Sequence, residues 1–370
     1  MLWDRAASRL MAFNAATAAI WPQIEAGRSP RQIAGGLVRR YGLPLERART
    51  DVDALFAELS RLGVLVGASF VADAEHGGAQ PADSSSPPLA QLMIRLGGLR
   101  LSIEAEAGVI AFLRLLFHGR MSVVDKVDRS IRVSGPTSNA AVSLDDAPRG
   151  VARSHEEAIG AIYELVLEAL HPNVDWLGRF HAAAVARGDT ALLLPAPSGS
   201  GKSTLLTSLV RDGYDYLSDS HAFISAGDHR VWPFPLGINL KRGSRDVIAI
   251  PRGFEAIDSA FPRGTEAIDL RNFELLDQVL APPSEAWAHP PVRVHAVVFP
   301  RYVAGAAPAF ARLTAIDALV RLLTAPVYLG DPLTARRISR FLRWVEATPS
   351  YNLVYGELAA AKALIAGLLP

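Results

Sequence analysis

Beyond about residue 90, apolar residues recur along this chain in two kinds of pattern. Short apolar runs, such as Ala191–Leu194 and Val292–Phe299, are typical of buried strands. Longer segments, Gly108–Phe117 and Glu156–Leu170, repeat apolar residues at helical spacing and predict amphipathic helices. Because strands and helices are interleaved, the pattern predicts an α/β fold with a mixed sheet. Further strands are predicted at 92–96, 99–103, 214–217, 221–225 and 231–234, and further helices at 315–323, 332–345 and 357–369.

Residues 1–66 follow a different pattern, in which two short strands precede helices. The strands are predicted at Leu2–Asp4 and Arg9–Phe13, and a helix is expected from Asn14 to Ile24. A serine followed by proline opens a second helix, Ser29–Tyr41, since proline is favoured at the first helical position. A third helix follows Pro44, and its core-facing residues at helical spacing are Val52, Leu55, Phe56, Leu59 and Leu62.

The segment between these two parts differs from both in composition. Residues 67–90 are rich in glycine, alanine, serine and proline and lack an apolar period, which predicts a flexible linker. The sequence therefore predicts a small N-terminal domain at 1–66 and a large α/β domain at 91–370.

Composition narrows the range of functions. The 370 residues carry a net charge of +1 and half of them are hydrophobic, so no global attraction to nucleic acid or to an anionic membrane is expected. There is no cysteine, which excludes disulfides, thiolate catalysis and cysteine-ligated zinc. Neither a membrane-spanning apolar run nor a signal-peptide core is found, and a cytoplasmic location with access to ATP is expected.

The strongest motif follows the apolar run Ala191–Leu194. A loop of small residues ends in the sequence GKST at 201–204, and apolar residues at helical spacing come next. Strand, glycine-rich turn and helix N-terminus together bind phosphates, with Lys202 adding a positive charge and Ser203 a ligand for Mg²⁺. Ala196 stands where the motif's first glycine is expected. The residues predicted to bind ATP are Ser198, Gly199, Ser200, Gly201, Lys202, Ser203 and Thr204.

Phosphoryl transfer also needs a carboxylate near this loop to hold the metal ion. Asp219 lies just after the predicted strand 214–217, and an acidic residue at the end of a neighbouring strand can hold Mg²⁺ together with Ser203. The alternative is an aspartate in a solvated turn. Asp219 is thus the candidate metal ligand.

The C-terminal part resembles the HPr kinase/phosphorylase family, in particular its shorter kinase-related members that include lasso-peptide kinases. The resemblance implies that Lys202 holds the β- and γ-phosphates and that Asp219 deprotonates a serine hydroxyl of a protein substrate. It also implies that His181 lies beside the phosphate site, whereas a packed histidine is the alternative for that residue. The residues that carry it are His181, Ser198–Ser203, Asp212–Asp219, Phe234-Pro235, Leu240-Lys241 and Val298–Arg301.

Two departures from the family are relevant to catalysis. The family has consecutive aspartates where this chain has Asp219-Ser220, which affects the expected metal affinity. The C-terminal signature of phosphorolysis is absent, so a kinase without the reverse reaction is expected. The roles of Lys241, Arg242 and Arg301 stay open between phosphate contact and surface solvation.

The N-terminal part resembles coenzyme PQQ synthesis protein D, the peptide-binding RiPP recognition element with a winged-helix type of fold. Such domains bind a leader peptide as an added strand on a sheet edge. A DNA-binding winged helix and a structural oligomerisation module are the alternatives. The residues that carry the resemblance are Leu2–Asp4, Leu10–Asn14, Trp21, Gln32–Ala34, Tyr41-Gly42 and Val52–Gly63.

The two resemblances together lead to one functional hypothesis. Residues 1–66 bind the leader of a ribosomally made precursor peptide, and residues 91–370 phosphorylate a serine of its core with ATP and Mg²⁺. Other peptide-modifying enzymes and a second copy of the chain are further partners under consideration, whereas nucleic acid and membrane are not expected. The rival hypotheses are a catalytically weak ATP-binding scaffold for other modifying enzymes and a DNA-binding regulator gated by ATP.

Overall fold

A computed structural model describes most of the chain, which divides into two compact units. One unit comprises Met1–Ala82 with Gly330–Thr334, and the other comprises Asp83–Leu329 with Ala335–Pro370. The described residues are 2–4, 9–11, 23–24, 26, 28–41, 44–61, 87–123, 126–197, 199–245, 247–258, 278–324, 327–330 and 333–369.

The N-terminal unit contains the short strands and helices that its sequence pattern predicts. Strands β1 (Leu2–Asp4) and β2 (Arg9–Met11) pair antiparallel, and helices α2 (Pro30–Tyr41) and α3 (Leu45–Arg61) follow. Ser29 caps α2, because its hydroxyl accepts from the Gln32 amide while the Gln32 side chain accepts from the Ser29 amide. The helix predicted at 14–24 falls mostly outside the described residues. The buried core of this unit comprises Ile33, Ala34, Ala48, Val52 and Phe56.

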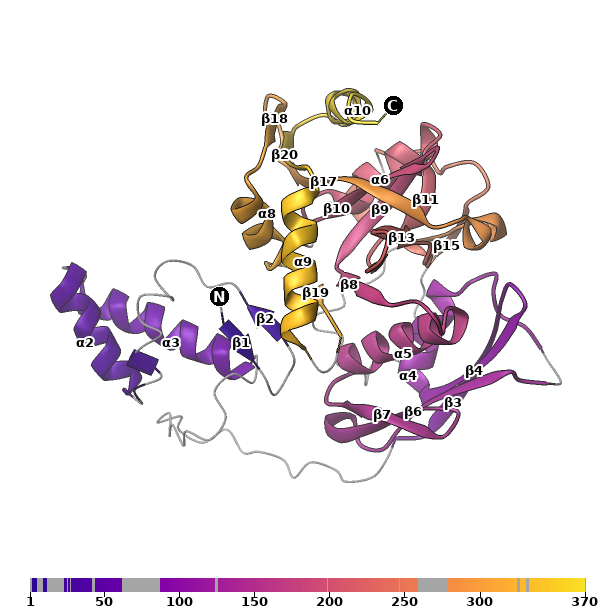
Figure 1. Ribbon diagram of the computed structural model, residues 1–370, viewed down its shortest axis with the longest axis horizontal. Helices are drawn as coiled ribbons and strands as arrows, with labels where there is room; N and C mark the ends of the chain where they lie inside the picture. The colour runs from indigo at the N-terminus through magenta and orange to yellow at the C-terminus, as the bar shows by residue number, and fades with distance from the viewer. Residues whose placement is uncertain are drawn as a thin grey trace. The chain divides into compact units, whose positions relative to one another are not determined.

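The second unit begins with a five-stranded sheet that carries helices on one face (Figure 1). Its first strand begins at Leu89, two residues inside the range predicted to be linker. Ser154 caps the second helix by accepting a hydrogen bond from the Glu157 amide. The elements are β3 (Leu89–Leu96), β4 (Leu99–Glu106), α4 (Ala107–Leu116), β5 (Arg129–Ser134), β6 (Ala140–Leu144), β7 (Ala147–Ala152) and α5 (His155–Leu170).

A mixed sheet of ten strands forms the rest of the framework, which confirms the predicted α/β class. Its main path runs β11-β9-β10-β17-β13-β12-β8-β19, with β20 paired to β17 and β18. The strands are β8 (Trp176–Phe180), β9 (Ala182–Arg187), β10 (Thr190–Pro195), β11 (Asp215–Ser218), β12 (Ala222–Ser225), β13 (Arg230–Trp232), β17 (Val292–Tyr302), β18 (Ala309–Arg312), β19 (Val327–Tyr328) and β20 (Ser350–Tyr355).

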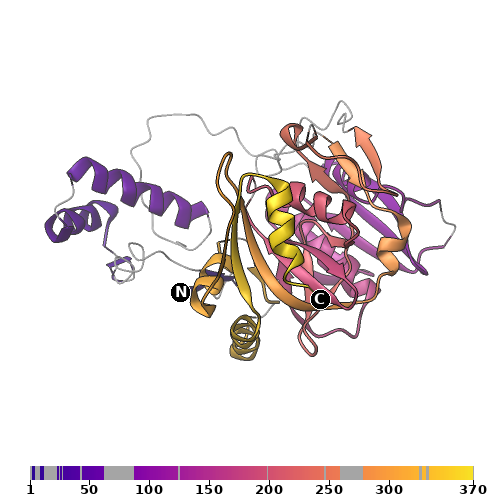
Figure 2. The same ribbon diagram turned by 90° about the horizontal axis from the view of Figure 1, so that it is seen from above.

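Helices α6 (Lys202–Arg211) and α10 (Leu358–Ala366) lie side by side against this sheet (Figure 2). Leu205 and Leu209 of α6 share one buried apolar cluster with Ile365 of α10. In the part of the chain that the structure describes, no helix has both the length and the apolar character needed to cross a membrane. The remaining elements are a three-stranded sheet of β14 (Ile238–Leu240), β16 (Gln278–Ala281) and β15 (Glu255–Asp258), and helices α7 (Arg242–Arg245), α8 (Ala315–Leu322) and α9 (Ala335–Ala347).

Strand directions bring four chain segments to one edge of the ten-stranded sheet. Strands β10, β17 and β20 are mutually parallel, and β11 runs the same way because both β10 and β11 pair antiparallel with β9. The carboxyl ends of these four strands therefore share an edge with the first residue of β9. Ligands bind beyond the carboxyl ends of strands in such sheets.

A second apolar cluster joins the five-stranded sheet to the larger one. Helices α4 and α5 and the strands of the five-stranded sheet contribute most of it, and Phe223, Phe234 and Leu236 of the second layer belong to the same cluster. The Gly237 amide donates to the Leu116 carbonyl at 3.0 Å, so that the chain after β13 lies against α4. This packing places one end of α4 and one face of α5 beside the edge of the ten-stranded sheet at which β10, β11, β17 and β20 end. We call this edge the carboxyl edge.

Candidate functional site

The glycine-rich loop connects β10 to α6 at the carboxyl edge. Gly199 and Gly201 have φ of 81° and 85°, in the left-handed region that favours glycine. A Cβ on Gly201 would lie 2.6 Å from the Tyr355 hydroxyl and 2.9 Å from Tyr302 Cβ. The loop is held by hydrogen bonds from the Tyr302 amide to the Ser200 carbonyl (2.9 Å) and from the Tyr355 hydroxyl to the Gly201 carbonyl (3.2 Å).

The departure at Ala196 is structurally mild. Ala196 is buried and is not among the described non-glycine residues with positive φ, so its Cβ causes no backbone strain there. The strand before the loop and the helix after it are both present, as the motif requires. Ser198, predicted to bind phosphate, lies outside the described residues.

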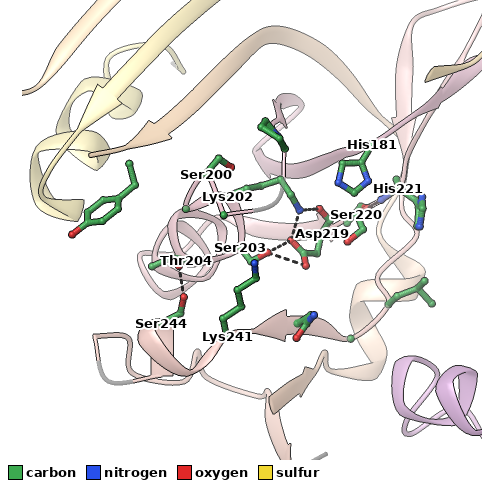
Figure 3. Close-up of a pocket in the computed structure, with 18 of the residues that line it drawn as sticks. His181, Ser200, Lys202, Ser203, Thr204, Asp219, Ser220, His221, Lys241 and Ser244 are labelled. Carbon is green, nitrogen blue, oxygen red and sulfur yellow. Dashed lines mark hydrogen bonds and ion pairs between the residues drawn. The ribbon is translucent and has the colours of Figure 1, made fainter. Parts of the chain in front are cut away.

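The buried Lys202 and Asp219 and the half-buried Ser203 form a polar cluster at the start of α6 (Figure 3). Lys202 Nζ donates to Asp219 Oδ1 at 2.9 Å and also to the Asp219 carbonyl. Ser203 Oγ donates to Asp219 Oδ1 at 2.9 Å and to Oδ2 at 3.2 Å. The Lys202 and Asp219 side chains are only 8% and 4% exposed, so each depends on the other for charge compensation.

Two histidines lie on the other side of Asp219 from Thr204 in Figure 3. His181 precedes β9 and His221 precedes β12, and their rings are 6.3 Å apart because Ala222 pairs with Phe180 in the sheet. Burial, reinforced by the charge of Lys202, lowers the pKa of His181 to about 4. Burial likewise lowers the pKa of His221 well below its usual value. Both rings are therefore neutral at neutral pH.

One cavity of about 990 Å³ contains all of these groups. It is lined by the loop, the start of α6 and the turn 218–221, with Tyr302 and Tyr355 beside the loop and residues of α4 and α5 on the side of His221. The cavity is large enough for a nucleotide and part of a second ligand. Of the residues predicted from the sequence, it brings together His181, Gly199, Ser200, Gly201, Lys202, Ser203, Thr204 and Asp219.

Several lining residues were not singled out by the sequence pattern. Tyr302 and Tyr355 end the parallel strands β17 and β20, and only the strand pairing shows that they flank the loop. Thr204 shares a 2.7 Å hydrogen bond with Ser244, which no local motif predicts. Lys241, left open between two roles, lines the cavity, whereas Arg301 is exposed and is not among the lining residues.

The donor set fits Mg²⁺ held jointly by protein and phosphate. No group of three or more His, Cys, Asp or Glu that could hold a metal occurs among the described residues. Ser203 Oγ and the Asp219 carboxylate form an oxygen pair, and Mg²⁺ in nucleotide sites takes one or two such protein ligands and completes its shell with phosphates and water. Ser220, which replaces the second aspartate, also lines the cavity.

Comparison with known proteins identifies the N-terminal part of the chain. Residues 2–65 match the family model described as Coenzyme PQQ synthesis protein D (PqqD). The chain thus carries a PqqD domain at its N-terminus, which confirms the resemblance predicted for residues 1–66. No curated protein sequence matches the chain. The resemblance of residues 91–370 to the HPr kinase family stays a prediction.

The lowered pKa of His181 predicts a specific dependence of stability on pH. Between pH 6.5 and about 4 the unfolded chain binds a proton at His181 that the folded chain does not, so the free energy of unfolding falls as the pH decreases. The slope due to this residue reaches up to ~1.4 kcal/mol per pH unit and vanishes above 6.5. Thermal unfolding measures this contribution of His181. Wild type and His181→Gln are compared at a pH above 6.5 and at a pH midway between 6.5 and about 4. Equal losses of stability in both proteins would contradict this prediction.

Proposed function

We propose that this protein is an ATP-dependent kinase that phosphorylates a serine of a precursor peptide held by its PqqD domain. The observation that carries the proposal is the polar cluster of Lys202, Ser203 and Asp219 beside the glycine-rich loop, in which Lys202 and Asp219 are buried. These are the three groups that phosphoryl transfer needs from a protein: a phosphate-binding ammonium, a metal-binding hydroxyl and a carboxylate.

The loop supplies the binding energy for the phosphates in this proposal. Backbone amides at the start of α6 and the helix dipole attract an anion, and the positive φ of Gly199 and Gly201 shapes the turn. A phosphate bound there would attract Lys202 Nζ away from Asp219 Oδ1, which releases the carboxylate for metal or for a proton. Mg²⁺, when bound, neutralises charge on the β- and γ-phosphate oxygens.

Transfer of the phosphoryl group then proceeds by displacement at the γ-phosphorus. The serine oxygen of the peptide forms a bond to the γ-phosphorus while the bond from that phosphorus to the β,γ-bridging oxygen breaks. The serine proton passes to the Asp219 carboxylate, and ADP leaves with the electron pair of the broken bond. Because His181 and His221 are neutral, neither ring competes with Lys202 for the phosphates.

The PqqD domain supplies the substrate in this proposal. Domains that resemble PqqD bind leader peptides, and a leader held by residues 1–66 would raise the local concentration of the peptide core near the kinase site. The length of the predicted linker at 67–90 would set how far the held peptide can extend towards the kinase site.

A second candidate function is an ATP-binding scaffold that presents the peptide to other enzymes. The observation that favours it is Ser220, because Asp219 then has no second aspartate beside it in the turn 218–221 and must both bind metal and accept a proton. The scaffold and the kinase differ in whether phosphate reaches the peptide.

The first prediction of the proposed function concerns Lys202 and ATP. Lys202→Ala removes a charge-assisted hydrogen bond to phosphate, and the Kd for ATP with Mg²⁺ should rise roughly tenfold to hundredfold. Isothermal titration calorimetry measures it. The control is Lys362→Ala, which breaks the 2.7 Å ion pair with Asp212 away from the cavity and should leave the Kd unchanged. Wild-type affinity in Lys202→Ala would refute the phosphate-binding assignment.

The second prediction concerns Asp219. Asp219→Asn keeps an oxygen for Lys202 but cannot accept a proton, so ATP should still bind while transfer falls by ~10²–10⁴. A shift in the Mg²⁺ dependence is expected as well, since the same carboxylate serves the metal. Transfer of labelled γ-phosphate to the peptide measures the rate, with Asp212→Asn as the control. Undiminished transfer in Asp219→Asn would rule out the proposed base.

The third prediction concerns the PqqD domain. The full chain should bind a precursor peptide, sought among the short reading frames next to its own, and a chain without residues 1–66 should lose that binding but retain ATP binding. Fluorescence anisotropy of the labelled peptide and calorimetry with ATP measure the two affinities. If the shortened chain binds the peptide as tightly as the full chain, the leader is recognised elsewhere and this division of labour is wrong.

A further inference from the structure

The cavity continues beyond Asp219 into a region with apolar walls. We call this region the apolar end. It is formed where α4 and α5 meet the chain that follows β13, and its side chains are buried by their neighbours yet line the cavity. Its residues are Phe112, Leu116, Ile159, Tyr163, Phe234 and Leu236.

Close contacts connect the apolar end directly to the reacting groups. The turn that begins with Ser218 and contains Asp219 is closed by hydrogen bonds in which the Ser218 hydroxyl donates to the His221 carbonyl and accepts from the His221 amide. The His221 ring lies 4.7 Å from the Tyr163 ring, and Tyr163 lies 5.7 Å from Phe234. The apolar end is thus adjacent to Asp219.

The direction of a bound nucleotide decides what this end can hold. In a phosphate-binding loop the lysine reaches the β- and γ-phosphates, so the γ-phosphate lies nearest Lys202 and Asp219. The nucleoside of such a ligand would then extend on the other side of the loop, where Tyr302 lies close to Gly201. The apolar end therefore faces the γ-phosphate from the side on which an acceptor must approach.

The six side chains of the apolar end carry no charge, and on α5 the exposed Glu156 lines the same cavity. The guanidinium of Arg179, which also lines the cavity, is engaged by the Glu164 carboxylate at 3.1 Å and by the Gly160 carbonyl at 3.1 Å. A charged side chain placed against the six apolar residues would lose hydration there, whereas a large apolar one would gain contacts with the aromatic walls.

We propose that the apolar end binds a large hydrophobic side chain of the peptide, from a residue close in sequence to the phosphorylated serine. The substrate class is therefore a peptide in which an aromatic or large aliphatic residue flanks the acceptor hydroxyl. This inference rests on the proposed kinase function and adds the specificity of the acceptor side.

The test uses the full chain with ATP, Mg²⁺ and synthetic peptides. Each peptide has one central serine in a glycine–alanine background, and a single flanking position carries Phe, Leu, Ala, Asp or Lys. At one flanking position, wild type should use the Phe and Leu peptides with a kcat/KM roughly tenfold to hundredfold above that for Ala, and higher still relative to Asp and Lys.

Two substitutions at one position change the size of the apolar end. Leu116→Trp fills it and should abolish the preference for Phe without changing the Kd for ATP, and Leu116→Ala enlarges it and should extend the preference to Trp. Leu115→Trp, on the same helix but not lining the cavity, is the matched control and should keep the wild-type preference. Thermal unfolding of each variant verifies that it folds.

The outcomes separate the two levels of the proposal. Transfer to the peptides without preference at any position, or a preference that persists in both Leu116 variants, overturns the apolar end as an acceptor subsite and leaves the kinase intact. Transfer to a leader-bearing precursor peptide but to none of these short peptides overturns the apolar end as a subsite that supports acceptor binding, and absence of transfer to the precursor peptide as well overturns the kinase. A preference that Leu116 controls and Leu115 does not supports the inference.

Discussion

The buried ion pair between Lys202 and Asp219 is the interaction on which the site depends. Two opposite charges with almost no exposure require one another, because either alone would be a desolvated ion. Lys202 begins α6 and Asp219 follows β11, so the pair links the helix to the sheet edge at the point where Ser203 also contacts the carboxylate. In the proposed kinase, an anion at the loop would compete with Asp219 for Lys202. Ligand binding would thereby be coupled to the availability of the carboxylate.

The strand order explains why these groups meet. Strand β9 lies between β10 and β11 and pairs antiparallel with both, so the ends of the two outer strands and the start of β9 share one edge. That arrangement collects Lys202, Asp219 and His181 although they are distant in sequence. The tyrosines at the ends of β17 and β20 complete the other side of the loop.

Local signals in the sequence predicted part of this arrangement. The loop from β10 to α6 and the cap at Ser29 were predictable because glycine, serine and proline act on their own neighbourhood. The aromatic residues of the apolar end were not, since Tyr163 and Phe234 resemble ordinary core positions and meet only through packing between two layers. The same holds for Tyr302 and Tyr355, whose place beside Gly201 depends on strand pairing over long sequence separations.

The reaction that we propose for this chain is the transfer of the γ-phosphoryl group of ATP to a peptide serine. The most direct test is mass spectrometry of the precursor peptide after incubation with the full chain, Mg²⁺ and ATP labelled with heavy oxygen on the γ-phosphate. We expect a peptide heavier by one labelled phosphoryl group, with fragmentation placing that group on a serine oxygen. An unmodified peptide, in the presence of bound ATP and bound peptide, would contradict the kinase function and favour a scaffold.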